Sequence, residues 1–342
     1  MAAVRIARGK FDGINACAGK NGVISAAAMD QRGSLQKSIG KAREDGKATA
    51  EDLATFKKAV VSILTPHASA ILIDPEFGLL ALEVKAPCDV CSPTRRPVMM
   101  RLSKDRLPDL LDEWSVRRLI EAGANAIKIL LYYDPADDAA INTIKHAFIE
   151  RIGAECAAND VPFFLEPVTY RDDVSGLAWA KAKPEAVTRS MEEFSKDKYG
   201  VDVLKVEVPI DMKFVSGTRS FTGEEAYTRE DALRLFKEAS DAATKPFIYL
   251  SAGVSNEQFV ETLLLAAESG ADYSGVLCGR ATWQEGVPIF GKDGIDALEA
   301  WLSTQGVENI NAVNNAVAAG AKPWWTVYGG KDAIEVFDPV LS

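Results

Sequence analysis

Eight short apolar runs recur along the 342-residue chain, and they limit how it can fold more than any other feature. Each run is about the length of a strand and is mostly apolar on both faces, as buried parallel strands are. Amphipathic helical patterns fill the gaps between them. The predicted strands are Val23–Met29, Ala70–Ile73, Pro97–Leu102, Ala124–Tyr133, Val161–Leu165, Val201–Pro209, Pro246–Leu250 and Ser274–Cys278.

Alternation of eight strands with helices favours an α/β fold of the (β/α)8 TIM-barrel type over a doubly wound open sheet. No GxGxxG motif is present, which weakens the open dinucleotide-binding alternative. We predict a single barrel domain over residues 1–342, with a barrel core at about 21–300 and an extension at each end. Polar stretches at Arg171–Gly200 and Lys213–Glu230 are expected to form long loops with short helices. Tryptophans in the C-terminal extension can dock it on the barrel, namely Trp301, Trp324 and Trp325.

The charged and rare residues exclude several classes of function. With 39 Lys plus Arg against 49 Asp plus Glu, the net charge is −10, which argues against a nucleic-acid partner. Only two histidines are present, too few for a three-histidine zinc site. The five cysteines are odd in number and irregularly spaced, which favours a reduced, cytoplasmic protein over a disulfide scaffold. No apolar run approaches the length of a membrane span, so we expect no membrane association.

Charged residues inside the predicted strands are the informative anomaly. Lys128 and Lys205 lie within apolar strands, where a lysine is costly unless it is paired or used. Glu166 and Asp30 follow two other strands directly. Strand ends of a barrel converge on one mouth, where active sites lie. The sequence therefore predicts that these four side chains meet.

Two lysines and two carboxylates in one pocket are the groups that Schiff-base chemistry needs. A desolvated lysine beside a second cation has a lowered pKa and becomes nucleophilic. A nearby carboxylate can then move protons between intermediates. The alternative is purely structural, with two buried ion pairs formed by Lys128 with Asp30 and by Lys205 with Glu166.

Small residues and an arginine follow the last two predicted strands. Ser251 and Gly253 come after the seventh strand, and Gly279 and Arg280 come after the eighth. This pattern is typical of the phosphate site of such barrels, with backbone N–H groups and a guanidinium as donors. The alternative is ordinary turn chemistry, which short βα loops need in any case. Beside two strand lysines, the phosphate interpretation is favoured.

Several longer motifs make the chain similar to a known family. From about Asn21 to Trp325 it resembles the class I tagatose-1,6-bisphosphate aldolases, which use a Schiff base and belong among the ketose-bisphosphate aldolases. The motifs that carry the resemblance are AAMDQRGSL at 27–35, ILIDPEFG at 71–78, DEWSVRRL at 112–119, AIKILLYYD at 126–134, YGVDVLKVEVP at 199–209, YLSAGV at 249–254 and SGVLCGRATW at 274–283.

The resemblance implies a role for each of the four charged residues. Lys205 would form the Schiff base, and Glu166 would act as the general acid and base. Lys128 would stabilise charge near the substrate carbonyl. Asp30 would handle the hydroxyl whose deprotonation breaks the C3–C4 bond. No cofactor and no metal is implied.

The resemblance also implies how the substrate is held. Ser251, Gly253, Gly279 and Arg280 fall where the family binds the C1 phosphate, and Gln31 stands beside Asp30 in the DQRG motif. The partner would be a phosphorylated ketose, cleaved to dihydroxyacetone phosphate and glyceraldehyde 3-phosphate. A homo-oligomeric state is also expected.

Three segments depart from the family pattern. They are the loop 88–96 with its Cys88–Cys91 pair, the tail after Trp325, and the segment Glu166–Asp173. If they face the distal end of the substrate, a 6-sulfo sugar phosphate becomes an alternative substrate. A sugar-phosphate-binding regulator without catalysis is a further alternative. The sequence leaves the choice between tagatose and fructose at C4 open.

Overall fold

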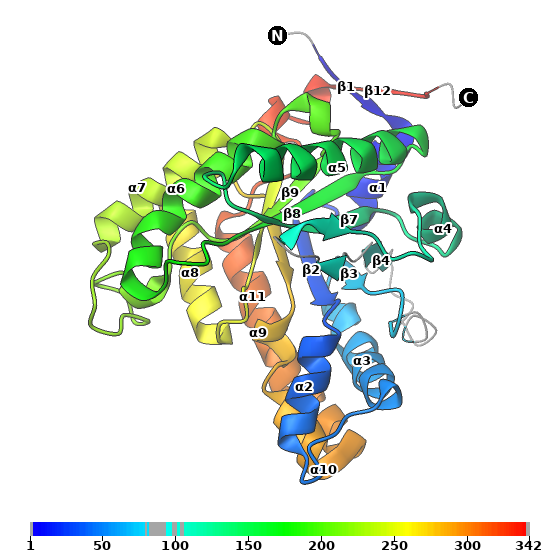
Figure 1. Ribbon diagram of the computed structural model, residues 1–342, viewed down its shortest axis with the longest axis vertical. Helices are drawn as coiled ribbons and strands as arrows, with labels where there is room; N and C mark the ends of the chain where they lie inside the picture. Colours follow the sequence, from blue (N-terminus) through cyan, green and yellow to red (C-terminus); the bar gives the residue numbers. More distant parts are fainter. Residues whose placement is uncertain (1–2, 79–80, 82–93, 98–100, 103–105, 340–342) are drawn as a thin grey trace.

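The computed structural model describes residues 3–78, 81, 94–97, 101–102 and 106–339. Within them, eight parallel strands close into a barrel in the order β10-β11-β2-β3-β4-β7-β8-β9 (Figure 1). The predicted (β/α)8 architecture is therefore confirmed. The barrel strands are β2 (Ile24–Met29), β3 (Ala70–Ile73), β4 (Thr94–Pro97), β7 (Ile127–Tyr133), β8 (Phe163–Thr169), β9 (Val203–Val206), β10 (Phe247–Leu250) and β11 (Gly275–Cys278).

The third barrel strand differs from its prediction. It is β4, Thr94–Pro97, whose backbone pairs with β3 and β7, whereas the predicted run Pro97–Leu102 shares only its first residue. The segment β5 (Arg101–Leu102) instead pairs antiparallel with β6 (Pro108–Asp109), outside the barrel. Backbone pairing needs no apolar side chains, so a strand with the polar sequence TRRP gives no hydrophobic signal.

The fifth strand and the segment after it also differ from the prediction. β8 continues through Thr169, because all seven of its residues pair with β7, so Glu166 lies inside the strand rather than at its end. The predicted long loop at 171–200 contains the 19-residue helix α6 (Gly176–Phe194). Its buried face includes Ala180, Val187 and Met191. Most other residues of the helix are polar, so the helical spacing of these apolar residues was not apparent in the sequence.

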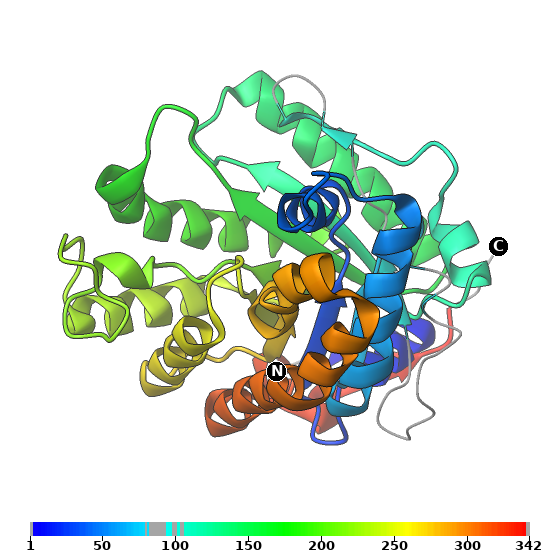
Figure 2. The same ribbon diagram turned by 90° about the horizontal axis from the view of Figure 1, so that it is seen from below.

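Helices surround the barrel. Figure 2 shows α2, α3 and α10 side by side, and they pack on one another with Phe56, Trp283 and Phe290 between them. A π-helical stretch at Leu302–Gly306 joins α10 to α11. The helices are α1 (Arg8–Cys17), α2 (Gly33–Ala42), α3 (Ala50–Leu64), α4 (Val116–Glu121), α5 (Ala139–Ala158), α6, α7 (Arg229–Ala242), α8 (Asn256–Glu268), α9 (Arg280–Trp283), α10 (Gly286–Trp301) and α11 (Val307–Gly320).

Strand residues alternate between the barrel interior and the helix-covered outside. One buried cluster fills the interior with side chains from most strands, among them Ala26, Ala126, Phe164, Val203 and Ile248. The residues between them on each strand pack outward against helices. In four of these segments the next inward-facing residue along the chain is charged. The four charged residues define the candidate site.

The two chain ends meet at the side of the barrel opposite α2 and α10 (Figure 1). There β1 (Val4–Ala7) pairs in parallel with β12 (Ile334–Phe337). Trp324 is fully buried in the same cluster as the barrel interior and contacts Phe11 and Trp325 edge to face. The predicted docking of the C-terminal extension on the barrel is therefore confirmed.

No helix in the described part of the chain is long and apolar enough to span a membrane. The Cys88–Cys91 pair lies outside the described residues, as does most of the 88–96 loop.

Candidate active site

Four charged side chains converge inside the barrel, from four strands. Lys128 is the second residue of β7, Glu166 the fourth of β8 and Lys205 the third of β9. Each comes two residues after an interior apolar residue, namely Ala126, Phe164 or Val203, so the backbone alternation directs it inward as well. Asp30 follows β2 directly and comes two residues after interior Ala28.

The four groups form one connected network. The Lys205 ammonium donates to Glu166 Oε2 at 2.9 Å, and Lys128 contacts the same oxygen. Lys128 also donates to Asp30 Oδ2 at 3.2 Å. Lys128 is fully buried, and the other three are at most 7% exposed. The sequence prediction that the four meet is confirmed. Two separate ion pairs are not what forms, because Lys128 joins both carboxylates.

The two lysines have opposite pKa shifts. Burial lowers the pKa of Lys205, and the ammonium of Lys128 adds to this, while Glu166 opposes it. Burial would also lower the pKa of Lys128, but the carboxylates of Glu166 and Asp30 outweigh it and raise that pKa. Lys205 is thus the lysine whose neutral, nucleophilic form is favoured.

Asp30 is held as a carboxylate. Burial acts to raise its pKa. The charges of Lys128 and Lys205 and the hydrogen bond from Lys128 outweigh burial and lower the pKa to about 2. Asp30 is therefore ionised at neutral pH and able to accept a proton or a hydrogen bond from a hydroxyl.

The residues predicted to hold a phosphate also come together. After β10, Ser251 is buried, Ala252 has φ of 50° and Gly253 has φ of 82°. Gly253 packs directly against the guanidinium of Arg280, where a Cβ would come within 2.7 Å of Cζ. Gly279 approaches the Ala28 carbonyl, which leaves no room for a side chain there either. The two loops thus meet through glycines beside a cation, as an oxyanion site requires.

Gln31 and Arg280 line one groove of about 530 Å³ between α2 and α10. The buried Gln31 Oε1 has no hydrogen-bond partner among the described residues, so it is an acceptor available to a ligand hydroxyl. Lys41 and Lys292 line the same groove, and no acidic residue of the described chain does. Within a protein of net charge −10, this groove is locally cationic.

Sequence reasoning missed a buried ion pair beside this site. Lys57 of α3 contacts Asp74, which follows β3, and both are fully buried. A signal for Lys57 exists in the sequence. It falls at helical spacing from Leu53, Val60 and Val61, and so it stands on the apolar face of its helix.

Sequence reasoning also left the segment after β8 without partners. Arg171 pairs with Asp134, at 3.1 Å from Nε to Oδ2. Tyr170 donates to Asp137 at 2.7 Å, and Arg106 lies over its ring at 4.1 Å from the centroid. These residues surround the ends of β7 and β8, at the mouth.

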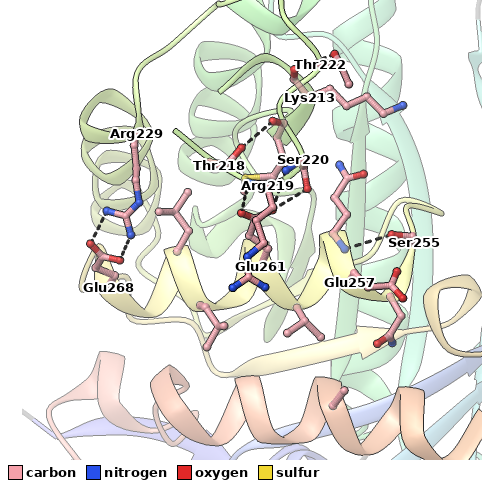
Figure 3. A pocket seen from close by; sticks show the side chains of 17 residues that line it. Lys213, Thr218, Arg219, Ser220, Thr222, Arg229, Ser255, Glu257, Glu261 and Glu268 are labelled. Atoms are coloured by element: carbon pink, nitrogen blue, oxygen red, sulfur yellow. Dashed lines mark hydrogen bonds and ion pairs between the residues drawn. The ribbon is translucent and has the colours of Figure 1, made fainter. Parts of the chain in front are cut away.

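A separate cavity of about 690 Å³ lies between α8 and the loop after β9 (Figure 3). Glu261 of α8 holds that loop by accepting from Arg219 N, from Ser220 N and from the Ser220 hydroxyl. No candidate catalytic residue lines this cavity. Likewise, the described residues include no group of three or more His, Cys, Asp or Glu side chains arranged to hold a metal ion.

Relatives of the chain carry a consistent set of names. A protein from Listeria monocytogenes called tagatose 1,6-diphosphate aldolase is 48% identical over 339 residues, 98% of this chain and 99% of that protein. Tagatose 1,6-diphosphate aldolase 2 of Enterococcus faecalis is 49% identical over 320 residues, 92% of this chain and 96% of that protein.

The fold has relatives at lower identity. A solved structure of fructose-bisphosphate aldolase from Plasmodium falciparum superposes with a TM-score of 0.66 at 14% identity, covering 94% of this chain and 99% of that one. Such low identity shows a shared fold alone. The sequence model described as DeoC/LacD family aldolase matches residues 24–285. With that match and relatives of 48% identity along nearly its whole length, the chain belongs to the DeoC/LacD family of aldolases.

Proposed function

We propose that this protein is a class I, Schiff-base aldolase that cleaves tagatose 1,6-bisphosphate to dihydroxyacetone phosphate and glyceraldehyde 3-phosphate. The observation that carries the proposal is the buried network of Lys205, Glu166, Lys128 and Asp30. Its support for this substrate is the name shared by relatives of 48–49% identity.

Lys205 is the nucleophile in this proposal, because burial and a neighbouring cation both favour its neutral amine. Lys128 contacts two carboxylates and stays charged, which suits it to stabilise negative charge that develops on the substrate oxygen. Each lysine thus has one task, and the difference between them comes from the number of carboxylates in contact.

The reaction follows from these groups. The Lys205 amine adds to the C2 carbonyl, and loss of water gives an iminium ion. Asp30 takes the C4 hydroxyl proton, the C3–C4 bond breaks, and its electron pair moves toward the iminium nitrogen to form an enamine. Glyceraldehyde 3-phosphate leaves. The proton taken by Asp30 passes through Lys128, which contacts both carboxylates, to Glu166. Glu166 donates it to C3, and water then hydrolyses the iminium to release dihydroxyacetone phosphate and free Lys205.

We place the C1 phosphate between the loops after β10 and β11, with the Ser251 hydroxyl, the backbone at Gly253 and Gly279, and the Arg280 guanidinium as donors. Gln31 is proposed to accept a hydrogen bond from a substrate hydroxyl. The cationic groove beside Arg280 suits an anionic substrate in general. A homo-oligomeric state and a cytoplasmic location stay predictions.

Two alternatives remain in view. A 6-sulfo sugar phosphate would undergo the same bond cleavage, because it differs from the bisphosphate only in carrying a sulfonate in place of the phosphate at the distal end, C6. A regulator that binds a sugar phosphate without catalysis is disfavoured, because a sensor needs no buried network of two lysines and two carboxylates, and such a network is costly to bury.

A substrate panel tests the proposal. Purified protein is given tagatose 1,6-bisphosphate, fructose 1,6-bisphosphate and their 6-sulfo analogues, and triose phosphate release is measured for each. We expect tagatose 1,6-bisphosphate to give the highest kcat/KM or to share it with its C4 epimer. Preferred cleavage of a 6-sulfo analogue would establish the first alternative, and binding without cleavage of any of them would establish the second.

A further inference from the structure

A fully buried ion pair lies next to the candidate site without belonging to it. Lys57, from the middle of α3, contacts Asp74, the residue after β3. Neither side chain has any exposed surface. In the mechanism above, neither touches the substrate.

Lys57 makes a second contact that ties it to the site. Its ammonium donates to the backbone carbonyl of Met29 at 3.0 Å. Met29 is the last residue of β2, and Asp30 follows it directly. Because Met29 is paired in register with Ile73 of β3, Lys57 joins the ends of two neighbouring strands.

Asp74 extends the connection to the other side of the DQRG segment. Its second oxygen accepts from the backbone N–H of Phe77 at 2.8 Å and so fixes the turn that follows β3. Glu76 in that turn forms an ion pair with Arg32. The segment Asp30–Gln31 is therefore held at its start by Lys57 and at its end by the turn that Asp74 shapes.

The stability of the folded chain does not by itself explain why an ion pair, rather than two apolar side chains, is buried at Lys57 and Asp74. Apolar side chains of similar volume are often as stabilising as a buried ion pair, whereas removal of one partner is strongly destabilising. What an apolar pair cannot supply is a donor for the Met29 carbonyl and an acceptor for the Phe77 N–H.

We propose that the Lys57–Asp74 pair is a positioning device that holds Asp30 at the geometry needed for C3–C4 cleavage. Lys57 and Asp74 are positioning residues, because they act through Asp30 and do not contact the substrate. The inference rests on the proposed function, which assigns Asp30 to the C4 hydroxyl. It predicts a defect confined to the cleavage step, since Schiff-base formation needs Lys205 and not Asp30.

Three variants separate positioning from stability. Lys57→Met leaves Asp74 buried and unpaired, and we expect Tm to fall by about 5–10 °C. Lys57→Met/Asp74→Asn removes both charges but keeps the acceptor for Phe77, so most of the lost Tm returns. Asp74→Asn alone keeps the Lys57 donor to Met29 (as a neutral amine). Comparison of the last two isolates that donor even if Lys57→Met alone does not fold.

We expect kcat for cleavage to fall by about 10- to 100-fold in Lys57→Met/Asp74→Asn and to stay near the wild-type value in Asp74→Asn. KM should change little in either, because the phosphate site is untouched. A matched control is Lys10→Met/Asp202→Asn, which removes a 2.8 Å ion pair between α1 and the start of β9. This control should lower Tm and leave kcat unchanged.

A partial reaction locates the defect. With dihydroxyacetone phosphate alone, borohydride trapping and exchange of the C3 proton with solvent report iminium and enamine formation without cleavage. Both should persist in Lys57→Met/Asp74→Asn while cleavage is lost. Recovery of wild-type kcat together with Tm in that variant would overturn the proposal, and so would loss of trapping in parallel with cleavage. Absence of trapping in the wild-type protein would instead contradict the proposed function.

Discussion

The contact between Gly253 and Arg280 gives a prediction whose size can be worked out from the structure. A Cβ at position 253 would lie 2.7 Å from Arg280 Cζ and 2.9 Å from Nη1, far inside van der Waals contact. The guanidinium is the end of a flexible, exposed side chain, so in Gly253→Ala it is the guanidinium that moves. The substitution therefore displaces the proposed phosphate donor without changing Arg280 itself.

Two energies contribute to the effect. Placing alanine at φ of 82° costs about 1–2 kcal/mol of stability. Loss of a charge-assisted hydrogen bond to the phosphate costs about 1.5–3 kcal/mol of binding, which is about 10- to 150-fold in KM. Chemistry at Lys205 is not touched, so kcat for the bound substrate should change much less than KM.

Gly270→Ala is the matched control, because Gly270 has φ of 74° but no atom within 4 Å of the position that a Cβ would take. Steady-state kinetics with the bisphosphate, inhibition by inorganic phosphate and thermal unfolding are measured for both variants. Both should lose similar Tm, and only Gly253→Ala should lose affinity for substrate and for phosphate. Equal KM values in the two variants would refute the placement of the phosphate at Arg280.

Three further outcomes are expected. Lys128→Met removes the like charge that lowers the pKa of Lys205 and frees two carboxylates that raise it, so the acid limb of the kcat/KM–pH profile should move to higher pH; an unchanged limb would argue against Lys205 as the titrating nucleophile. Cleavage should survive prolonged EDTA treatment, and loss of activity that zinc restores would contradict the lysine mechanism. Trp324→Ala should cost about 3–5 kcal/mol of unfolding free energy with kcat retained, because the side chain is fully buried near the chain termini and away from the mouth; a large kcat loss at full folding would contradict that separation.

The fold could be predicted from the sequence wherever the residues of a paired barrel strand are also apolar. Seven of the eight barrel strands overlap their predicted runs by three residues or more, because strands buried on both faces are mostly apolar. The polar strand Thr94–Pro97 could not be found in this way, since hydrogen bonds to β3 and β7 define it. The helix Gly176–Phe194 was missed because its buried stripe is short of large apolar residues.

The site was predictable in its members but not in its connections. Lys128 and Lys205 stood out as charges within apolar runs, and barrel topology predicted that they would meet Asp30 and Glu166 at one mouth. Which oxygen each ammonium contacts depends on side-chain rotamers and strand register, so the sequence left open whether one network or two separate pairs would form. Lys57 was not predicted, because the signal used for the other two lysines was a charge within an apolar strand, whereas Lys57 lies on the apolar face of a helix.

Identification of the Lys205 adduct is the most direct test of the central claim. Dihydroxyacetone phosphate and borohydride are added together, and the modified residue is located by intact-mass and peptide mass spectrometry. The account predicts a single reduced triose adduct on Lys205, absent from Lys205→Met and abolished when borohydride is added without the triose. No adduct, or an adduct on Lys128 in the folded wild-type protein, would contradict it.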